Sequence, residues 1–196
     1  DKFDIHTGGV DNIFPHHEAE IAQYEGFVGD EVVSHWAHGQ HLLADGAKMS
    51  KSLGNSFTLS DIESHGIDPL AFRYLCLTAR FKSRLNFDFE SLLAAERALF
   101  RLRNRVSGWI RKSCNELSEV DEITQGQWKS RFMGCLNNNL DTPGALSVAW
   151  KLVHTEISSK TKLNLFVIFD EILGLGLFDY FKSLVPTVKM NAQLAQ

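Results

Sequence analysis

Apolar residues recur at helical spacing through the second half of the chain. Four of them share a period of about 3.6 residues: Leu99, Leu102, Val106 and Ile110. They predict an amphipathic helix over residues 91–113 with one face packed on a core. Similar patterns predict helices over residues 127–137, 142 to about 158, and 160–173. Pro143 suits a first helical turn, and Gly174 and Gly176 suit a helix end, so the chain from Glu90 onwards reads as an all-α bundle.

The first 45 residues combine two short strands with one helix. A short apolar strand ends at Ile5, and Gly8 and Gly9 then allow a turn that brings the backbone close to a ligand. Residues 16–23 suit a helix after Pro15, and residues 32–36 suit a second strand. This order predicts an α/β part, the second half of a Rossmann-type nucleotide-binding domain.

Short helices are predicted between the α/β part and the bundle. Ser60 is placed to cap one helix, and Pro69 to begin the next. Residues 120–126 are polar and predict a connector inside the bundle. The expected division is residues 1–58 with a mobile loop at 46–58, a helical connective region at 59–90, and a helical bundle at 91–196.

Composition predicts a cytoplasmic protein without a membrane span. Of the 196 residues, 44% are apolar, which is enough for one or two packed domains, and no apolar run is long enough to cross a bilayer. Three scattered cysteines predict small buried side chains or free thiols rather than disulfides or metal ligands: Cys76, Cys114 and Cys135. The net charge of -4 does not by itself indicate a nucleic-acid partner.

A local run of positive charge changes that picture. Six basic residues and no acidic residue lie between positions 97 and 112: Arg97, Arg101, Arg103, Arg105, Arg111 and Lys112. Arg97, Arg101 and Arg105 stand four residues apart, so they share one face of the predicted helix. The row is either an ordinary solvated face or a contact surface for RNA phosphates.

The most specific chemical signal is the pentapeptide Lys48-Met49-Ser50-Lys51-Ser52. Two lysines three residues apart, among small and flexible residues, can fold over a polyphosphate. Their ammonium groups would then neutralise charge that develops on a leaving pyrophosphate. The alternative is a solvated basic turn, which is what most strings with this lysine spacing are.

A second signal is the pair His16 and Glu20. If residues 16–23 are helical, the two side chains stand at positions i and i+4 and share one face. A histidine and a carboxylate at that spacing can supply two ligands to one zinc ion. The alternative is a surface hydrogen bond or a solvated helix face.

Together these stretches resemble the cysteinyl-tRNA synthetases, which are class I aminoacyl-tRNA synthetases. The pentapeptide matches the KMSKS loop of class I enzymes. Residues 4–23 match the family's D-I-H-G-G-G-x-D-x-x-F-P-H-H-E-N-E-I-A-Q segment, apart from Thr7 and Ala19. We expect an ordinary φ at Thr7, because a β-branched residue resists positive φ. The likeness is specific over the first 90 or so residues and looser afterwards.

The resemblance implies ATP-dependent activation of cysteine to cysteinyl-adenylate, with Mg²⁺, and transfer to tRNA(Cys). It implies that His16 and Glu20 are zinc ligands and that Asp11 pairs with the substrate ammonium group. Lys51, with Lys48, would stabilise the ATP phosphates, and His6 matches an active-site histidine. The bundle, with Arg97, Arg101 and Arg105, would be of the tRNA-binding type.

The family's H-I-G-H motif and two cysteine zinc ligands belong to a segment that this sequence does not contain. We therefore expect a C-terminal fragment that lacks the first half of the Rossmann domain and shows no cysteine-dependent ATP–pyrophosphate exchange on its own. Two alternatives stay open. One is the related ligase that joins cysteine to an amino sugar, and the other is a truncated paralogue that binds tRNA or a partner without catalysis.

Overall fold

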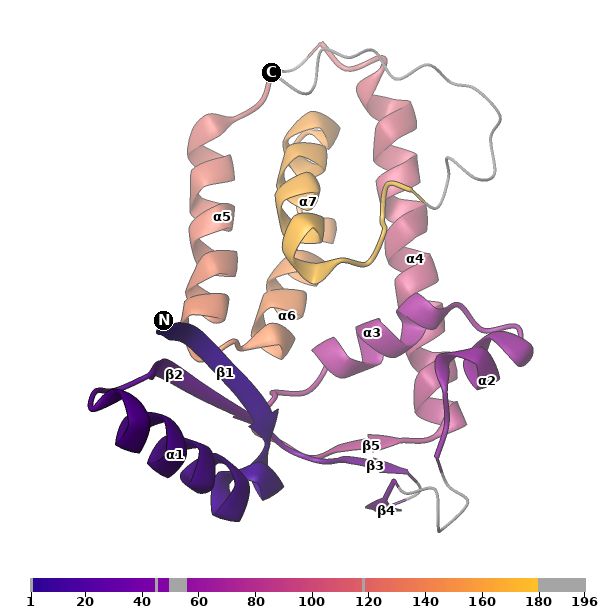
Figure 1. Ribbon diagram of the computed structural model, residues 1–196. Coiled ribbons are helices and arrows are strands. Elements are labelled where there is room, and N and C mark those ends of the chain that lie inside the picture. Colours follow the sequence, from indigo (N-terminus) through magenta and orange to yellow (C-terminus); the bar gives the residue numbers. More distant parts are fainter. Residues whose placement is uncertain (1, 45, 50–55, 118, 180–196) are drawn as a thin grey trace.

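A small α/β part comes first in the chain, and helices make up most of the remaining residues (Figure 1). The computed structural model describes residues 2–44, 46–49, 56–117 and 119–179. In these ranges no helix has the length and apolar character that a membrane crossing requires. The predicted order, an α/β part followed by an all-α bundle, is confirmed.

The α/β part is a strand–helix–strand unit. Strand β1 (Phe3–Gly9) runs parallel to β2 (Val33–Gly39), with Phe3 opposite Val33 and Gly9 opposite Gly39. Between them lie a 3-10 turn η1 (Val10–Asn12), a π turn η2 (Ile13–His17) and helix α1 (Glu18–Val28). β1 is longer than predicted, and the helix begins two residues later, because the π turn occupies its expected first turn.

A second small sheet joins segments that are far apart in the sequence. Strand β3 (Leu42–Ala44) pairs antiparallel with β4 (Ala47–Lys48) and parallel with β5 (Leu85–Phe87). The prediction of only helices over residues 59–90 is therefore wrong at β5. These strands have two or three residues each, which is too short for an alternating pattern to mark them.

Two short helices lead into the bundle. Helix α2 (Leu59–Ser64) is capped by Thr58, which exchanges hydrogen bonds with Asp61, so the prediction of Ser60 as the cap is wrong. Helix α3 (Pro69–Leu77) begins at Pro69 as predicted, and the Asp68 carboxylate accepts a hydrogen bond from the Leu70 N–H.

Four helices form the bundle: α4 (Phe89–Ser113), α5 (Glu122–Asn137), α6 (Thr142–Val153) and α7 (Ser159–Leu173). α5 begins five residues earlier than predicted, because Asp121 caps it and draws most of the expected connector into the helix. α6 ends at Val153 rather than near 158, and the Lys162 ammonium group donates to the Val153 carbonyl there.

The buried core lies almost wholly in the helical part. Leu99, Leu102 and Val106 are buried as predicted, but Ile110 is 38% exposed, and Trp109 is the buried residue at that turn. The rings of Phe132 and Phe169 stack with centroids 4.0 Å apart. All three cysteines are free thiols, and none is fully buried.

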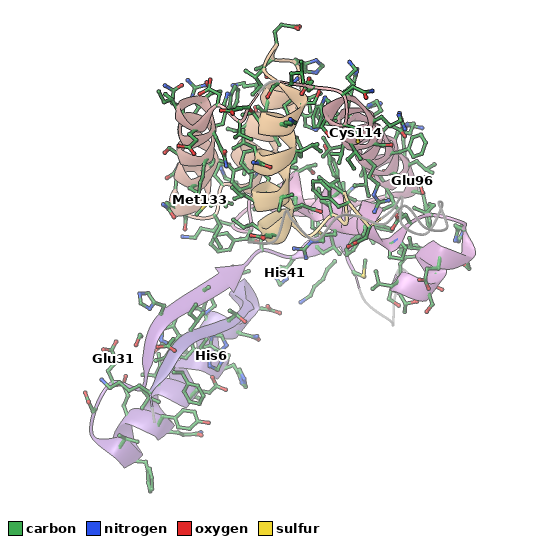
Figure 2. The ribbon with its side chains drawn as sticks, turned by 90° about the horizontal axis from the view of Figure 1, so that it is seen from above. His6, Glu31, His41, Glu96, Cys114 and Met133 are labelled. Carbon is green, nitrogen blue, oxygen red and sulfur yellow. The ribbon has the colours of Figure 1, made fainter. Side chains whose placement is uncertain are left out.

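The α/β part projects away from the bundle, as Figure 2 shows from above. Residues His6 and Glu31 lie on this projecting part, whereas Glu96, Cys114 and Met133 lie on the bundle. The main-chain N–H of Gln40 donates to the Phe81 carbonyl at 2.7 Å and so ties the end of β2 to the loop before β5.

Candidate active site

The end of β1 and the start of α1 bring the predicted chemical groups together. β1 carries His6, η1 carries Asp11, and the π turn carries His16 into the helix that holds Glu20. Gly8 and Gly9 lie in paired strand β1, so the prediction of a turn there is wrong. A Cβ atom at Gly8 would lie 2.6 Å from Cε1 of His17, so this position of the strand needs a glycine for close approach of the ring. Thr7 is not among the described residues with positive φ, as predicted.

Glu20 lies between two histidines. Its Oε1 atom is 3.3 Å from Nε2 of His16, which is the predicted i, i+4 contact, and its Oε2 atom is 3.3 Å from Nε2 of His6. Oε2 is shielded from solvent and accepts no hydrogen bond from the described residues. A carboxylate so placed suits a cation.

These distances fit a metal site. Two donors bound to one tetrahedral zinc ion at about 2.0–2.1 Å stand about 3.3 Å apart. Histidine nitrogen and carboxylate oxygen are ordinary zinc donors. The geometry therefore allows Glu20 to share a metal with His16 or with His6.

His17 is a site residue that the sequence analysis missed. Its ring is buried, and its Nδ1 atom lies 2.8 Å from Nε2 of His38. Ligand atoms of His6, His17 and Glu20 lie within 4.8 Å of one another, so this trio could also hold a metal. The sequence did offer one signal for His17, namely the His16-His17 doublet. Adjacent residues on a helical turn point in different directions, so the second histidine of such a pair can face the interior of the site.

The surroundings of the His17 ring favour its neutral form. Burial lowers the pKa of His17, and the nearby His6 and His38 rings lower it further. The Trp36 indole also packs against it, with ring centroids 4.8 Å apart. A neutral ring keeps a lone pair available as an acceptor or a metal donor.

Asp11 contacts the strand that leads into the KMSKS segment. Its Oδ2 atom accepts a hydrogen bond from the Lys48 ammonium group at 3.3 Å. The pKa of Asp11 is lowered, first by a hydrogen bond from its own main-chain N–H and then by Lys48. The structure thus brings two predicted site residues together from positions 37 apart in the sequence.

The remaining predicted residues lie elsewhere. Lys51 lies outside the described residues. Arg97, Arg101 and Arg105 are exposed on one side of α4, in the helical part rather than beside Glu20. Arg103 from the same basic run is buried, and it forms an ion pair with Asp68 and donates to the Leu175 carbonyl.

Comparison with known proteins identifies similar sequences. Residues 1–97 match the family model of the tRNA synthetases class I (C) catalytic domain. The cysteine–tRNA ligase 1 of Burkholderia lata is 42% identical over 179 residues, which cover 91% of this chain and 36% of that protein. The cysteine–tRNA ligase of Opitutus terrae is 53% identical over 103 residues, which cover 53% of this chain and 22% of that protein.

The chain belongs to the cysteine–tRNA ligase family. It spans about a third of the length of the curated relatives it matches. The family model covers all of the site described above, from His6 to Lys48, together with the first turns of α4.

A solved structure extends the likeness in fold to the bundle. The chain matches the crystal structure of a ternary complex of Agrobacterium radiobacter K84 agnB2 LeuRS, tRNA and LeuAMS with a TM-score of 0.70. The match covers 98% of this chain and 30% of that one, at 14% sequence identity. The fold of the α/β part together with the bundle is therefore that of a class I synthetase segment.

Proposed function

We propose that this chain supplies the amino-acid side of the active site of a cysteine–tRNA ligase. The reaction is ATP-dependent activation of cysteine to cysteinyl-adenylate, followed by transfer of the cysteinyl group to tRNA(Cys). The observation that carries the proposal is the placement of Glu20 between two histidines, in the same strand–helix–strand unit as a carboxylate, Asp11, that already binds an ammonium group.

Asp11 would bind the ammonium group of cysteine. Its carboxylate accepts a hydrogen bond from a lysine ammonium group, which has the same donor chemistry as the α-ammonium of an amino acid. Its pKa is lowered, so it is ionised at neutral pH. About half of the side chain is exposed, which leaves it accessible to a substrate.

His16 and Glu20 would hold a zinc ion together with ligands from outside this chain. When bound, zinc would take the cysteine thiolate as a ligand and reject serine, because a hydroxyl is a far poorer zinc ligand than a thiolate. Discrimination of that strength would make a separate editing site unnecessary. His6 contacts the other carboxylate oxygen of Glu20 and would hold that side chain in place.

Lys48 and Lys51 would bind the phosphates of ATP. Mg²⁺ would accompany ATP as the usual counterion of these phosphates. Lys48 already lies at the edge of the site through its contact with Asp11. Lys51 stands three residues further along the chain. Such positioned cations stabilise charge that develops on pyrophosphate. A cytoplasmic location of the protein is part of the same proposal.

The experiment is cysteine-dependent ATP–pyrophosphate exchange by the complete gene product, with serine as the competing substrate. We expect exchange with cysteine only, and we expect Asp11→Asn to raise the KM for cysteine at least tenfold. Glu18→Gln is the matched control, because Glu18 lies exposed on α1 and has no part in the proposed site. Cysteine transfer to an amino sugar and not to tRNA would overturn the proposal.

A further inference from the structure

A hollow on the helical part lies outside the candidate active site. It has a volume of about 480 Å³ and is formed by α3, by α4 and by the C-terminal end of α6. Its main lining residues are Tyr74, Arg101, Asn104, Arg105, Trp150 and His154. The volume falls within the range of about 300–1,000 Å³ that is typical of small-ligand sites.

The hollow carries positive charge that its own lining does not neutralise. Arg101 and Arg105 are exposed, and none of the described residues that line the space is a carboxylate. Neither arginine forms an ion pair with another described residue. Guanidinium groups in such a place remain available for an anion, and a phosphate is the anion they bind with the best geometry.

One wall of the hollow is a fixed aromatic surface. The Trp150 indole N–H donates to the Tyr74 hydroxyl at 2.8 Å, and Tyr74 is only 6% exposed, so the indole is held by a buried partner. The His154 ring lies nearly parallel to the indole, at 25°, with centroids 6.5 Å apart. Flat rings beside cations are the combination that binds unpaired nucleotides, by stacking and by phosphate contact.

The charge also extends beyond the hollow. Arg97 continues the row of Arg101 and Arg105 along α4, one turn further towards its start and outside the lining. Successive members of this row are about 6 Å apart along the helix axis. A row of separated cations matches a chain of phosphates better than it matches the single phosphate group of a free nucleotide.

We propose that this hollow binds one unpaired nucleotide of an RNA, with the base on Trp150 and His154 and the phosphate on Arg101 and Arg105. Asn104 offers a donor and an acceptor to the edge of the base. The assignment rests on the proposed function, since that function supplies tRNA as the RNA. It adds that an unpaired position of the RNA, rather than a duplex, is what the bundle recognises here.

The test compares two fluorescently labelled RNA hairpins whose identical stems are closed by a non-nucleotide linker, so that neither has an unpaired loop. One carries a single-nucleotide bulge, and the other has a fully paired stem. Anisotropy titrations with the wild-type chain are expected to show at least tenfold tighter binding of the bulged hairpin. Trp150→Leu should remove most of that preference, because loss of one stacking contact lowers affinity by roughly 5- to 150-fold. His154→Ala should reduce it in the same direction. His154 is exposed, so that variant keeps the test valid even if Trp150→Leu does not fold.

Loss of the two arginines should change a different quantity, the salt dependence of RNA binding. Arg101→Gln with Arg105→Gln should weaken binding of both hairpins and lower the slope of log K against log salt by about one to two. Lys129→Gln on α5 is the control, because Lys129 is exposed on a helix that does not line the hollow. It should leave both the preference and the salt slope unchanged.

Two outcomes would overturn the inference. One is equal binding of the two hairpins, and the other is a preference that survives both Trp150→Leu and His154→Ala. Displacement of the bulged hairpin by millimolar AMP, with no preference between hairpins, would assign the hollow to free nucleotides instead. Cysteine-dependent exchange is measured without RNA, so its failure would refute the ligase proposal while leaving the hairpin preference intact.

Discussion

The α/β part and the helical bundle differ in where they keep their large apolar side chains. In the α/β part, Phe27 is 91% exposed, Phe14 is 77% exposed and Ile5 is 65% exposed. In the bundle, Phe166 and Phe169 are fully buried in a core that runs through α4–α7. The chain thus carries its chemical groups on the part that buries few apolar residues, and its core in the other part.

This difference assigns stability and chemistry to separate regions. Apolar burial is the dominant favourable term in folding, so most of it comes from the bundle. The geometry of the α/β site depends on polar contacts over short distances instead, such as those of Glu20 with His6 and His16. Substitutions in the two regions should therefore change different measured quantities.

The largest expected effect is on stability. Phe169→Ala leaves a cavity beside Phe132 and Phe166 and should lower the free energy of unfolding by roughly 3–5 kcal/mol. Phe27→Ala, on α1, should change it by less than about 0.5 kcal/mol, because that ring is almost wholly in solvent. Urea unfolding followed by circular dichroism measures both. Similar losses for the two variants would erase the contrast between the regions.

The next effect is on the chemical step alone. Lys51→Ala in the complete gene product should slow adenylate formation by roughly 10²–10³-fold, through loss of about 3–4 kcal/mol of transition-state stabilisation. Lys48→Ala should cost less, and neither should move the melting temperature much. Pre-steady-state adenylate formation at saturating ATP and cysteine is the measurement. An unchanged rate for Lys51→Ala would show that the KMSKS segment is not the phosphate clamp.

Substitutions at the α/β site should lower the affinity for zinc, whereas substitutions in the bundle should not. His16→Ala should lower zinc affinity and cysteine affinity by more than the roughly 10- to 100-fold that is typical when a residue merely supporting a metal ligand is lost. Glu20→Gln should cost more, because that carboxylate contacts both His6 and His16. Competition with a chelator measures zinc binding, with Glu18→Gln as control. Unchanged metal content in His16→Ala would remove that residue from the site and favour the trio of His6, His17 and Glu20.

The smallest effect is a change of one pKa. Lys48 is the second cause of the lowered pKa of Asp11, so Lys48→Ala should raise that pKa part of the way towards its ordinary value of 3.8. A lowered carboxyl pKa stabilises the fold above pH 3.8, and this contribution is lost as the pH falls through the folded-state value. In Lys48→Ala the folded-state pKa of Asp11 lies closer to 3.8, so the pH range over which this stabilisation is lost should become narrower. Carbon-13 NMR titration of Asp11 checks this, and an unmoved pKa would mean that the contact is too weak to matter.

Local signals in the sequence predicted much of the architecture and part of the site. Helical periodicity located all four bundle helices, and Pro69 marked the start of α3. The spacing of His16 and Glu20 predicted their contact. Helix ends were less accurate, because capping by Thr58 or Asp121 depends on which of several suitable side chains reaches the free N–H groups. The three-part domain division and the role of each site residue stay predictions.

The sequence by itself determined the family, the KMSKS segment and the faces of individual helices, because these depend on residues a few positions apart. Only the tertiary structure decided that His17 packs against His38, that Lys48 meets Asp11, and that Tyr74 and Trp150 share one hollow. Periodicity says which side of an element is apolar but not which other element will cover it. Contacts between distant segments depend on how whole helices and strands pack against one another, and a local sequence pattern does not determine that packing.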